Sequence, residues 1–203
     1  MKKYGWLICL IAASCTPEEP QDSIPPPPLE PIEKWTSFTI LPGEHNCEES
    51  TFSLATSDTL SFKAVFDSSA IYLNQDPSNQ LDWNKLYGYS DCSSFHQNNS
   101  FRIGWRWTPQ TGIEVGAYYY VQSQRLFETI VVTQPNDTLD VGIAKADSTY
   151  EVSVNGINKS YPRGCKGAQS NAYYLFPYFG GDETAPDTIT IFMTFETPKD
   201  LFP

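Results

Sequence analysis

The sequence predicts an all-β protein, an antiparallel β-sandwich of jelly-roll type. Three observations support this prediction. Apolar residues recur at every second position in many short segments, which indicates strands with one buried face. Twelve Tyr, twelve Phe and five Trp make the chain rich in residues that favour strands. Short turns separate the segments and none shows a helical period, so no crossover helix is expected.

The N-terminus is typical of a secretion signal. Two lysines precede an apolar run, residues 6–13, and small residues lead into Cys15. The run is too short to span a bilayer, so residues 1–14 are expected to be a cleaved signal peptide. Residues 11–15, Ile-Ala-Ala-Ser-Cys, resemble the lipobox of bacterial lipoproteins, with Ala12 in place of the usual Leu. The resemblance implies cleavage before Cys15 and lipidation of its thiol; the alternative is an ordinary secreted chain.

A tether is predicted between the lipidated Cys15 and the domain, over residues 15–33. Residues 16–33 hold seven of the 16 prolines and five acidic residues, with almost no apolar pattern. Such a segment cannot bury a core and is expected to be extended, at ~3 Å per residue. Its acidity next to Cys15 resembles the export signals of Bacteroidetes surface lipoproteins. The implied location is the bacterial outer membrane, with the domain facing the medium or the periplasm.

Residues 34–203 are enough for one domain with a full core. The chain carries a net charge of −11, which becomes −13 when the two signal lysines are removed. Such a charge argues against a nucleic-acid partner and against direct adsorption to an anionic membrane. The membrane partner is therefore expected to be reached only through the lipid.

The expected strands follow one another at short spacing. Asp58–Asp67 alternates cleanly, with apolar side chains at its even positions. Asn155-Gly156 is the strongest short hairpin signal, and residues 135–137, Pro-Asn-Asp, predict a second hairpin between their flanking strands. Alternate residues from Ile189 to Phe195 are expected to face the core. In chain order the expected strands are Trp35–Leu41, Thr51–Leu54, Asp58–Asp67, Leu81–Asp91, Phe101–Trp107, Ile113–Val121, Phe127–Thr133, Thr138–Lys145, Thr149–Val154, Ile157–Tyr161, Ala172–Phe179 and Asp187–Phe195.

The segment Phe101–Val121 predicts a hairpin whose two faces can be told apart. Its apolar residues alternate on both sides of a turn at residues 108–112, Thr-Pro-Gln-Thr-Gly. A shift of one residue in the pairing would turn the apolar side chains outward, which favours the register that pairs Trp107 with Ile113 or one two residues away. The expected inner pairs are Trp107 with Ile113, Trp105 with Val115, Ile103 with Ala117, and Phe101 with Tyr119.

The outer face of the same hairpin predicts a ligand groove. Two glycines side by side would leave a shallow notch for a polar ligand such as a carboxylated sugar chain. The alternative is a loop or helix packed closely over the glycines, with the charged pair contributing well under ~1 kcal/mol. The expected outer pairs are Arg106 with Glu114, Gly104 with Gly116, and Arg102 with Tyr118.

Four segments resemble a family of Bacteroidetes lipoproteins, and the resemblance spans roughly residues 80–195. The segments are 85–91, KLYGYSD; 104–107, GWRW; 117–121, AYYYV; and 177–186, PYFGGDETAP. The family brings no established activity. In architecture the chain also resembles the concanavalin-like sandwiches, which include glucan-binding modules and alginate-type polysaccharide lyases. That likeness implies a two-sheet fold.

The first functional hypothesis is a non-catalytic surface module that binds a glycan or serves as a scaffold. Aromatic faces stack on sugar rings, and arginine forks pair with uronate carboxylates. No catalytic residue is expected under this hypothesis, and the ligand partner is a glycan. The candidate ligand-binding residues are Arg102, Arg106, Glu114, Tyr118 and Tyr120.

The second hypothesis is a polysaccharide lyase acting on uronate-containing glycans. Such chemistry needs a group that neutralises the uronate and a base that removes the C5 proton. His96, Arg102 and Tyr118 are the candidates, and a shared cleft would favour this hypothesis. A third hypothesis is a structural subunit or adhesion partner in an envelope complex, which a flat outer face covered by its own loops would favour.

Cofactors are not expected, with calcium as the single weak candidate. Asp182 and Glu183 follow two glycines in a tight turn, and paired carboxylates with backbone carbonyls can bind Ca²⁺. An oxidising compartment allows one disulfide among the three cysteines that remain after lipidation, Cys47, Cys92 and Cys165. Spacing does not select the pair; the preferred one is Cys47 with Cys92.

Overall fold

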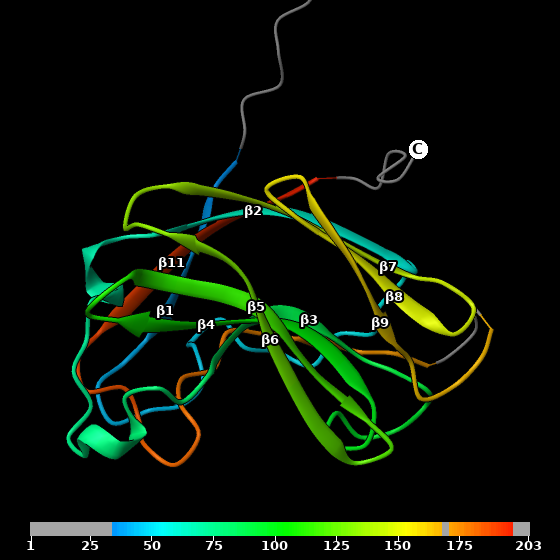
Figure 1. Cartoon of the computed structure of the whole chain (residues 1–203), viewed down its shortest axis with the longest axis horizontal. Coiled ribbons are helices and arrows are strands. Elements are labelled where there is room, and N and C mark those ends of the chain that lie inside the picture. Colours follow the sequence, from blue (N-terminus) through cyan, green and yellow to red (C-terminus); the bar gives the residue numbers. More distant parts are fainter. Residues whose placement is uncertain (1–33, 168–170, 197–203) are drawn as a thin grey trace, which may run out of the picture. The chain divides into compact units, whose positions relative to one another are not determined.

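The computed structural model describes residues 34–167 and 171–196, which form an antiparallel β-sandwich (Figure 1). The signal peptide, Cys15 and the tether lie outside these residues. Within them, no helix has the length and apolar character needed to cross a membrane. The strands are β1 (Thr36–Ile40), β2 (Thr59–Phe66), β3 (Asn84–Ser90), β4 (Ser100–Thr108), β5 (Gly112–Val121), β6 (Gln124–Thr133), β7 (Thr138–Lys145), β8 (Thr149–Val154), β9 (Ile157–Pro162), β10 (Tyr174–Leu175) and β11 (Ile189–Glu196).

The strands form two sheets, and every pairing is antiparallel. The six-stranded sheet has the order β1-β11-β2-β7-β8-β9, and the five-stranded sheet has the order β10-β3-β4-β5-β6. Two 3-10 turns, Ser68–Ala70 and Pro77–Asn79, are the helical elements among the described residues. The predicted all-β sandwich is therefore confirmed.

The β4–β5 hairpin has the register that the alternation predicts. Trp107 pairs with Ile113 and Phe101 with Tyr119, so the expected inner and outer pairs all form. The inner side chains pack into the core between the sheets, where the ring centroid of Trp105 lies 4.7 Å from that of Phe66 on β2. Trp105 is completely buried, whereas Trp107 near the turn is half-buried. Burial of one face thus fixes which side chains remain outside.

The predicted hairpin across residues 135–137 is wrong. β6 pairs with β5 in one sheet, whereas β7 pairs with β2 and β8 in the other, so the chain crosses between the sheets here. Asn136 takes a positive φ of 71°, and its N–H donates to the carbonyl of Phe66 at the end of β2. This hydrogen bond attaches the turn to β2 of the six-stranded sheet, which the next strand, β7, then joins. The hairpin at Asn155-Gly156 forms as predicted.

Two of the expected strands were also wrong. Thr51–Leu54 is not a strand, and it makes only a single bridge, between Leu54 and Tyr173. The strand expected over Ala172–Phe179 is reduced to β10 and isolated bridges. Phe195 near the end of β11 faces the core as expected, with its ring centroid 6.0 Å from that of Phe62 and 5.0 Å from that of Tyr87, although 42% of the residue is exposed.

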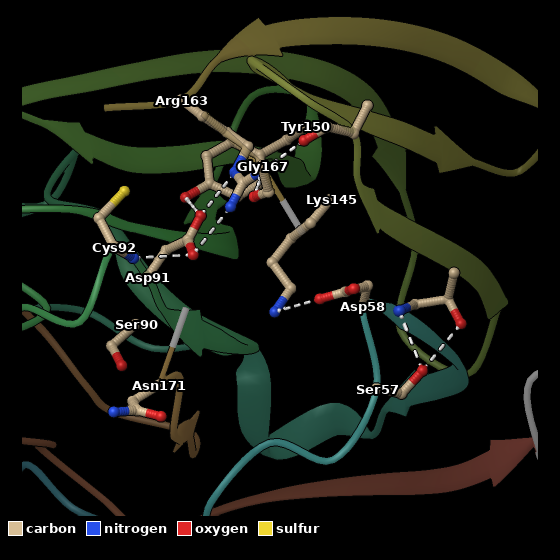
Figure 2. A network of polar contacts seen from close by, with 12 residues as sticks. Ser57, Asp58, Ser90, Asp91, Cys92, Lys145, Tyr150, Arg163, Gly167 and Asn171 are labelled. Carbon is tan, nitrogen blue, oxygen red and sulfur yellow. Dashed lines mark hydrogen bonds and ion pairs between the residues drawn. The ribbon is translucent and has the colours of Figure 1, made fainter. Parts of the chain in front are cut away.

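A buried ion pair joins the two sheets at one end of the sandwich (Figure 2). Asp91 follows β3 and Arg163 follows β9, and both side chains are completely buried. The guanidinium donates from Nε to Oδ2 at 2.7 Å and from Nη2 to Oδ1 at 3.1 Å. Tyr150 donates its hydroxyl to the same Oδ2 at 2.7 Å. Such a bidentate pair tolerates burial because its donors and acceptors are matched.

The disulfide lies beside this ion pair and joins Cys92 to Cys165, with a Cα–Cα distance of 5.6 Å. The preferred pairing of Cys47 with Cys92 is therefore wrong. Cys92 is adjacent to Asp91, and Cys165 is two residues from Arg163. The disulfide and the ion pair therefore join the same two chain segments. Cys47 is a free, buried thiol in the core, where burial raises its pKa to about 12.

Substituting Cys165→Ser should lower the free energy of unfolding by about 2–5 kcal/mol, because the bridge closes a long loop. Urea unfolding measures this difference. Reductant should destabilise the parent chain by a similar amount and leave the Cys165→Ser variant unchanged. Peptide mapping without reduction should find Cys92 linked to Cys165; a cross-link containing Cys47 would contradict the structure.

Candidate functional site

A cavity of about 250 Å³ opens on the outer face of the five-stranded sheet. Its floor comes from β3, β4, β5 and β6, and two loops, 91–99 and 176–187, form its sides. Figure 1 shows the orange segment, which includes residues 176–187, on the side of this sheet away from the six-stranded sheet. The lining residues are Lys85, His96, Gln97, Arg102, Tyr118, Tyr120, Arg125, Tyr178, Gly181 and Asp182.

Arg102 is the buried cation at the centre of this cavity. It lies on β4 directly opposite Tyr118 on β5, and only 7% of it is exposed. Its Cζ lies 5.5 Å from the centroid of the Tyr118 ring. Within the described part of the chain its Nε has no hydrogen-bond partner, and Arg102 makes no ion pair with a carboxylate. A buried guanidinium without a counter-ion is costly, so the cavity is suited to an anion.

Lys85 is a second buried cation, on the neighbouring strand β3. Its Nζ donates to the carbonyl of Gly180 at 2.5 Å and lies 4.8 Å from the ring centroid of Tyr118. Burial, together with repulsion from Arg102, lowers the pKa of Lys85 to about 7. The amine is therefore partly neutral near pH 7, and a lysine in that state can accept a proton.

Tyr118 supplies a hydroxyl that stays protonated. Burial and a hydrogen bond with Tyr120 raise the pKa of Tyr118 to about 12. His96, on the loop after β3, is half-buried, and its Nδ1 lies 3.2 Å from the hydroxyl oxygen of Tyr173. Burial, followed by repulsion from Arg102, lowers the pKa of His96. The cavity thus combines a proton donor, Tyr118, with a lysine that is partly neutral near pH 7 and a histidine whose pKa is lowered.

The loop after β10 closes the cavity because its glycines pack against the start of β3. Gly180 has a φ of 72°, and its N–H donates to Oδ1 of Asn84 at 2.5 Å. A Cβ on Gly181 would lie 2.7 Å from a carboxylate oxygen of Asp82, so no larger residue fits without a shift. These contacts bring Asp182 to the cavity rim.

The two calcium candidates, Asp182 and Glu183, have different surroundings. Asp182 lines the cavity. Both carboxylate oxygens of Glu183 accept backbone hydrogen bonds, from Gln75 N at 3.0 Å and from Asp76 N at 2.9 Å. Glu183 thereby ties this loop to the preceding 3-10 turn. Calcium binding here stays a prediction.

The notch expected over Gly104 is filled. A Cβ on Gly104 would lie 2.8 Å from the Trp83 ring, which is itself buried. Arg106 packs its guanidinium 4.8 Å from the Trp83 ring centroid and donates to Glu114 from Nε at 2.9 Å and Nη2 at 2.7 Å. The segment before β3 therefore packs over the glycine, which is the alternative that the sequence left open.

The structure brings five of the sequence-predicted residues together in the cavity: His96, Arg102, Tyr118, Tyr120 and Asp182. It places Arg106 and Glu114 outside, paired with each other beside Trp83. The sequence interpretation missed Lys85, Arg125 and Tyr178. Lys85 had one available signal, a charged residue within an otherwise uncharged strand. Arg125 and Tyr178 carry no local signal, because separate segments bring them to the site.

Solved structures with the same fold include alginate lyases. The alginate lyase Aly36B superposes with a TM-score of 0.56 at 13% identity, over 78% of this chain and 78% of that chain. The alginate lyase AlyC3 gives 0.52 at 9% identity, over 78% and 71%. The alginate lyase vAL-1 from Chlorella virus gives 0.50 at 12% identity, over 80% and 83%. The chain matches no protein-family model and no curated protein.

At these identities the likeness shows the fold alone. The chain is an antiparallel sandwich of the jelly-roll class, and its cavity lies on the outer face of one sheet. The function of the cavity depends on its own residues and not on the fold.

Lys85 should make the stability of the chain depend on pH. Because its pKa falls from 10.5 to about 7 on folding, the unfolded chain binds a proton between these values that the folded chain lacks. Stability should therefore rise with pH in this window, by ~1.4 kcal/mol per pH unit. In Lys85→Met this contribution should vanish, so urea unfolding from pH 7 to 9 should give a shallower slope than in the parent.

The matched control is Lys159→Met, which removes an exposed lysine on β9. Its slope should equal that of the parent chain. Equal slopes in Lys85→Met and the parent would show that Lys85 keeps an ordinary pKa.

Proposed function

We propose that this protein is a lyase that cleaves uronate-containing polysaccharides in the cavity around Arg102. The observation that carries the proposal is a buried, unpaired guanidinium in one cavity with a lysine of lowered pKa and a protonated tyrosine. The chain as a whole is acidic, with a net charge of −11. Two arginines, Arg102 and Arg125, line a single cavity together with Lys85, which is partly protonated near pH 7, and this concentration of positive charge indicates selection for an anionic group.

Arg102 is the group that binds the uronate carboxylate. A guanidinium forms two parallel hydrogen bonds with a carboxylate, and a buried one gains most from an incoming counter-ion. Withdrawing charge from the carboxylate acidifies the proton on C5. Arg125, which is exposed on β6 beside Tyr120, adds positive charge at the cavity mouth.

Lys85 serves as the base and Tyr118 as the acid. The neutral Nζ of Lys85 takes the C5 proton, and the electron pair left on C5 forms the C4–C5 double bond. The C4–O4 bond breaks, and the Tyr118 hydroxyl gives its proton to the departing O4. The two groups suit these roles because one is partly unprotonated and the other fully protonated near pH 7. His96 and Tyr178 line the same cavity and are assigned to sugar binding.

A non-catalytic glycan-binding module is the second candidate. The aromatic rings beside the cavity favour it, since Phe52 and Phe95 are 75% and 79% exposed. Such rings bind sugars without any proton transfer. Among the solved structures with this fold, one of Aly36B is described as a complex with an alginate tetrasaccharide, at a TM-score of 0.53. This fold therefore accommodates an acidic glycan in that protein.

The full chain in detergent should convert a uronate-containing polysaccharide into products with the absorbance of an unsaturated uronate. Lys85→Met and Tyr118→Phe should each lower kcat by about 10²–10⁴-fold, because each removes one proton-transfer group. Binding of the polysaccharide should persist in both variants. Arg102→Gln should weaken binding itself.

The control variant is Lys159→Gln, which removes an exposed cation far from the cavity in sequence and on the other sheet. It should retain full turnover and binding. Binding by the parent without turnover would replace the lyase with the binding module. Turnover that survives in both Lys85→Met and Tyr118→Phe would remove these residues from the chemistry.

The location is also part of the proposal: the domain is held at the bacterial outer membrane by a lipid on Cys15. The support is the lipobox-like segment and the proline-rich, acidic segment that follows it. Cells expressing the parent chain should incorporate labelled palmitate into it and retain it in the membrane fraction. Cys15→Ser should lose the label and move to the soluble fraction; membrane retention of that variant would contradict a lipid anchor.

A further inference from the structure

A larger and more apolar cavity adjoins the one that holds Arg102. Its volume is about 530 Å³, and it shares three lining residues with the first cavity: His96, Arg102 and Tyr178. The two cavities are therefore parts of one groove along the outer face of the five-stranded sheet. The remaining lining residues of the larger cavity are Asn46, Ser50, Thr51, Phe52, Phe95, Tyr173, Tyr174, Leu175 and Phe176.

Aromatic rings dominate this second cavity. The Phe52 ring lies 5.5 Å from the Tyr173 ring, and both it and Phe95 are mostly exposed to solvent. Phe176 adds a further ring and packs against Tyr87 of β3. Exposed rings that line a concave surface are a ligand platform, since a soluble domain otherwise buries them.

The two cavities differ in charge. Lys85, Arg102 and Arg125 line the first, whereas Arg102 is the sole lysine or arginine among the residues lining the second. Arg102 can pair with one carboxylate at a time in the bidentate manner. A second carboxylate placed over Phe52 and Phe95 would lose water without gaining a cation, which is unfavourable.

From this charge pattern we infer that the natural ligand is a heteropolysaccharide in which a uronic acid is followed by a sugar without a carboxylate. The uronic acid occupies the cavity of Arg102, and the neighbouring sugar places its C–H face on Phe52, Phe95 and Tyr173. A polymer with a carboxylate on every sugar fits the groove less well. This inference rests on the proposed function, because both require the acid to bind at Arg102.

The test compares oligosaccharides of equal length by calorimetry with the full chain in detergent. One probe alternates glucuronate with N-acetylglucosamine, a second contains glucuronate with glucose and a 6-deoxy sugar, and a third is a homopolymer of uronate. At least one of the mixed probes should bind about tenfold or more tightly than the homopolymer. Phe52→Ala and Phe95→Ala should each weaken binding of the mixed probe by about 5–50-fold, because each removes apolar area that the sugar covers, and should leave homopolymer binding nearly unchanged.

The control variant is Leu73→Ala, which removes an equally exposed apolar side chain outside both cavities and should change neither affinity. Tighter or equal binding of the homopolymer, or Phe variants that bind all probes as the parent does, would overturn the inference and leave the proposed function standing. Failure of every acidic probe to bind would overturn both.

Discussion

The buried pair of Asp91 and Arg163 is the interaction on which the candidate site depends. Asp91 follows β3 of one sheet, and Arg163 follows β9 of the other. The disulfide from Cys92 to Cys165 reinforces the same junction. Loop 91–99, which carries His96, begins at this junction and leads into β4. Removing one partner would leave an uncompensated charge in the core, so the position of the loop is set by electrostatics as well as by packing.

Two buried arginines in this chain show how burial alone does not define a role. Arg163 donates hydrogen bonds to Asp91 and to backbone carbonyls. Burial by itself would lower its pKa, but the hydrogen bond and the negative charge of Asp91 outweigh burial and raise the pKa. Arg102, on the outer face of the other sheet, has no such partner among residues 34–167 and 171–196, and burial lowers its pKa. The first arginine stabilises the fold. The burial of Arg102 without a counter-ion destabilises the fold, and a bound anion would offset this destabilisation.

The proposed chemistry and the proposed specificity follow from one groove. Near Arg102 the groove concentrates positive charge and holds a lysine whose pKa lies near neutrality. Towards Phe52 and Phe95 it becomes aromatic and loses its cations. A polysaccharide bound across both parts would place one sugar against charged side chains and the next sugar against aromatic rings. Affinity and substrate choice would then arise from different residues, which makes them separable by mutation.

The sequence by itself determined the sandwich and the faces of the β4–β5 hairpin, because alternation excludes any register shifted by one residue, which would turn Trp105 and its neighbours outward; the register expected from the turn at 108–112 is the one that forms. It therefore also placed Arg102 opposite Tyr118. The crossing from β6 to β7, the disulfide and the inclusion of Lys85 in the site were decided by the tertiary structure. Each depends on segments that are distant in sequence. In the turn after β6, for example, the N–H of Asn136 donates to the carbonyl of Phe66. Alternation reports which face of a strand is buried, and it carries no information about which sheet the next strand joins.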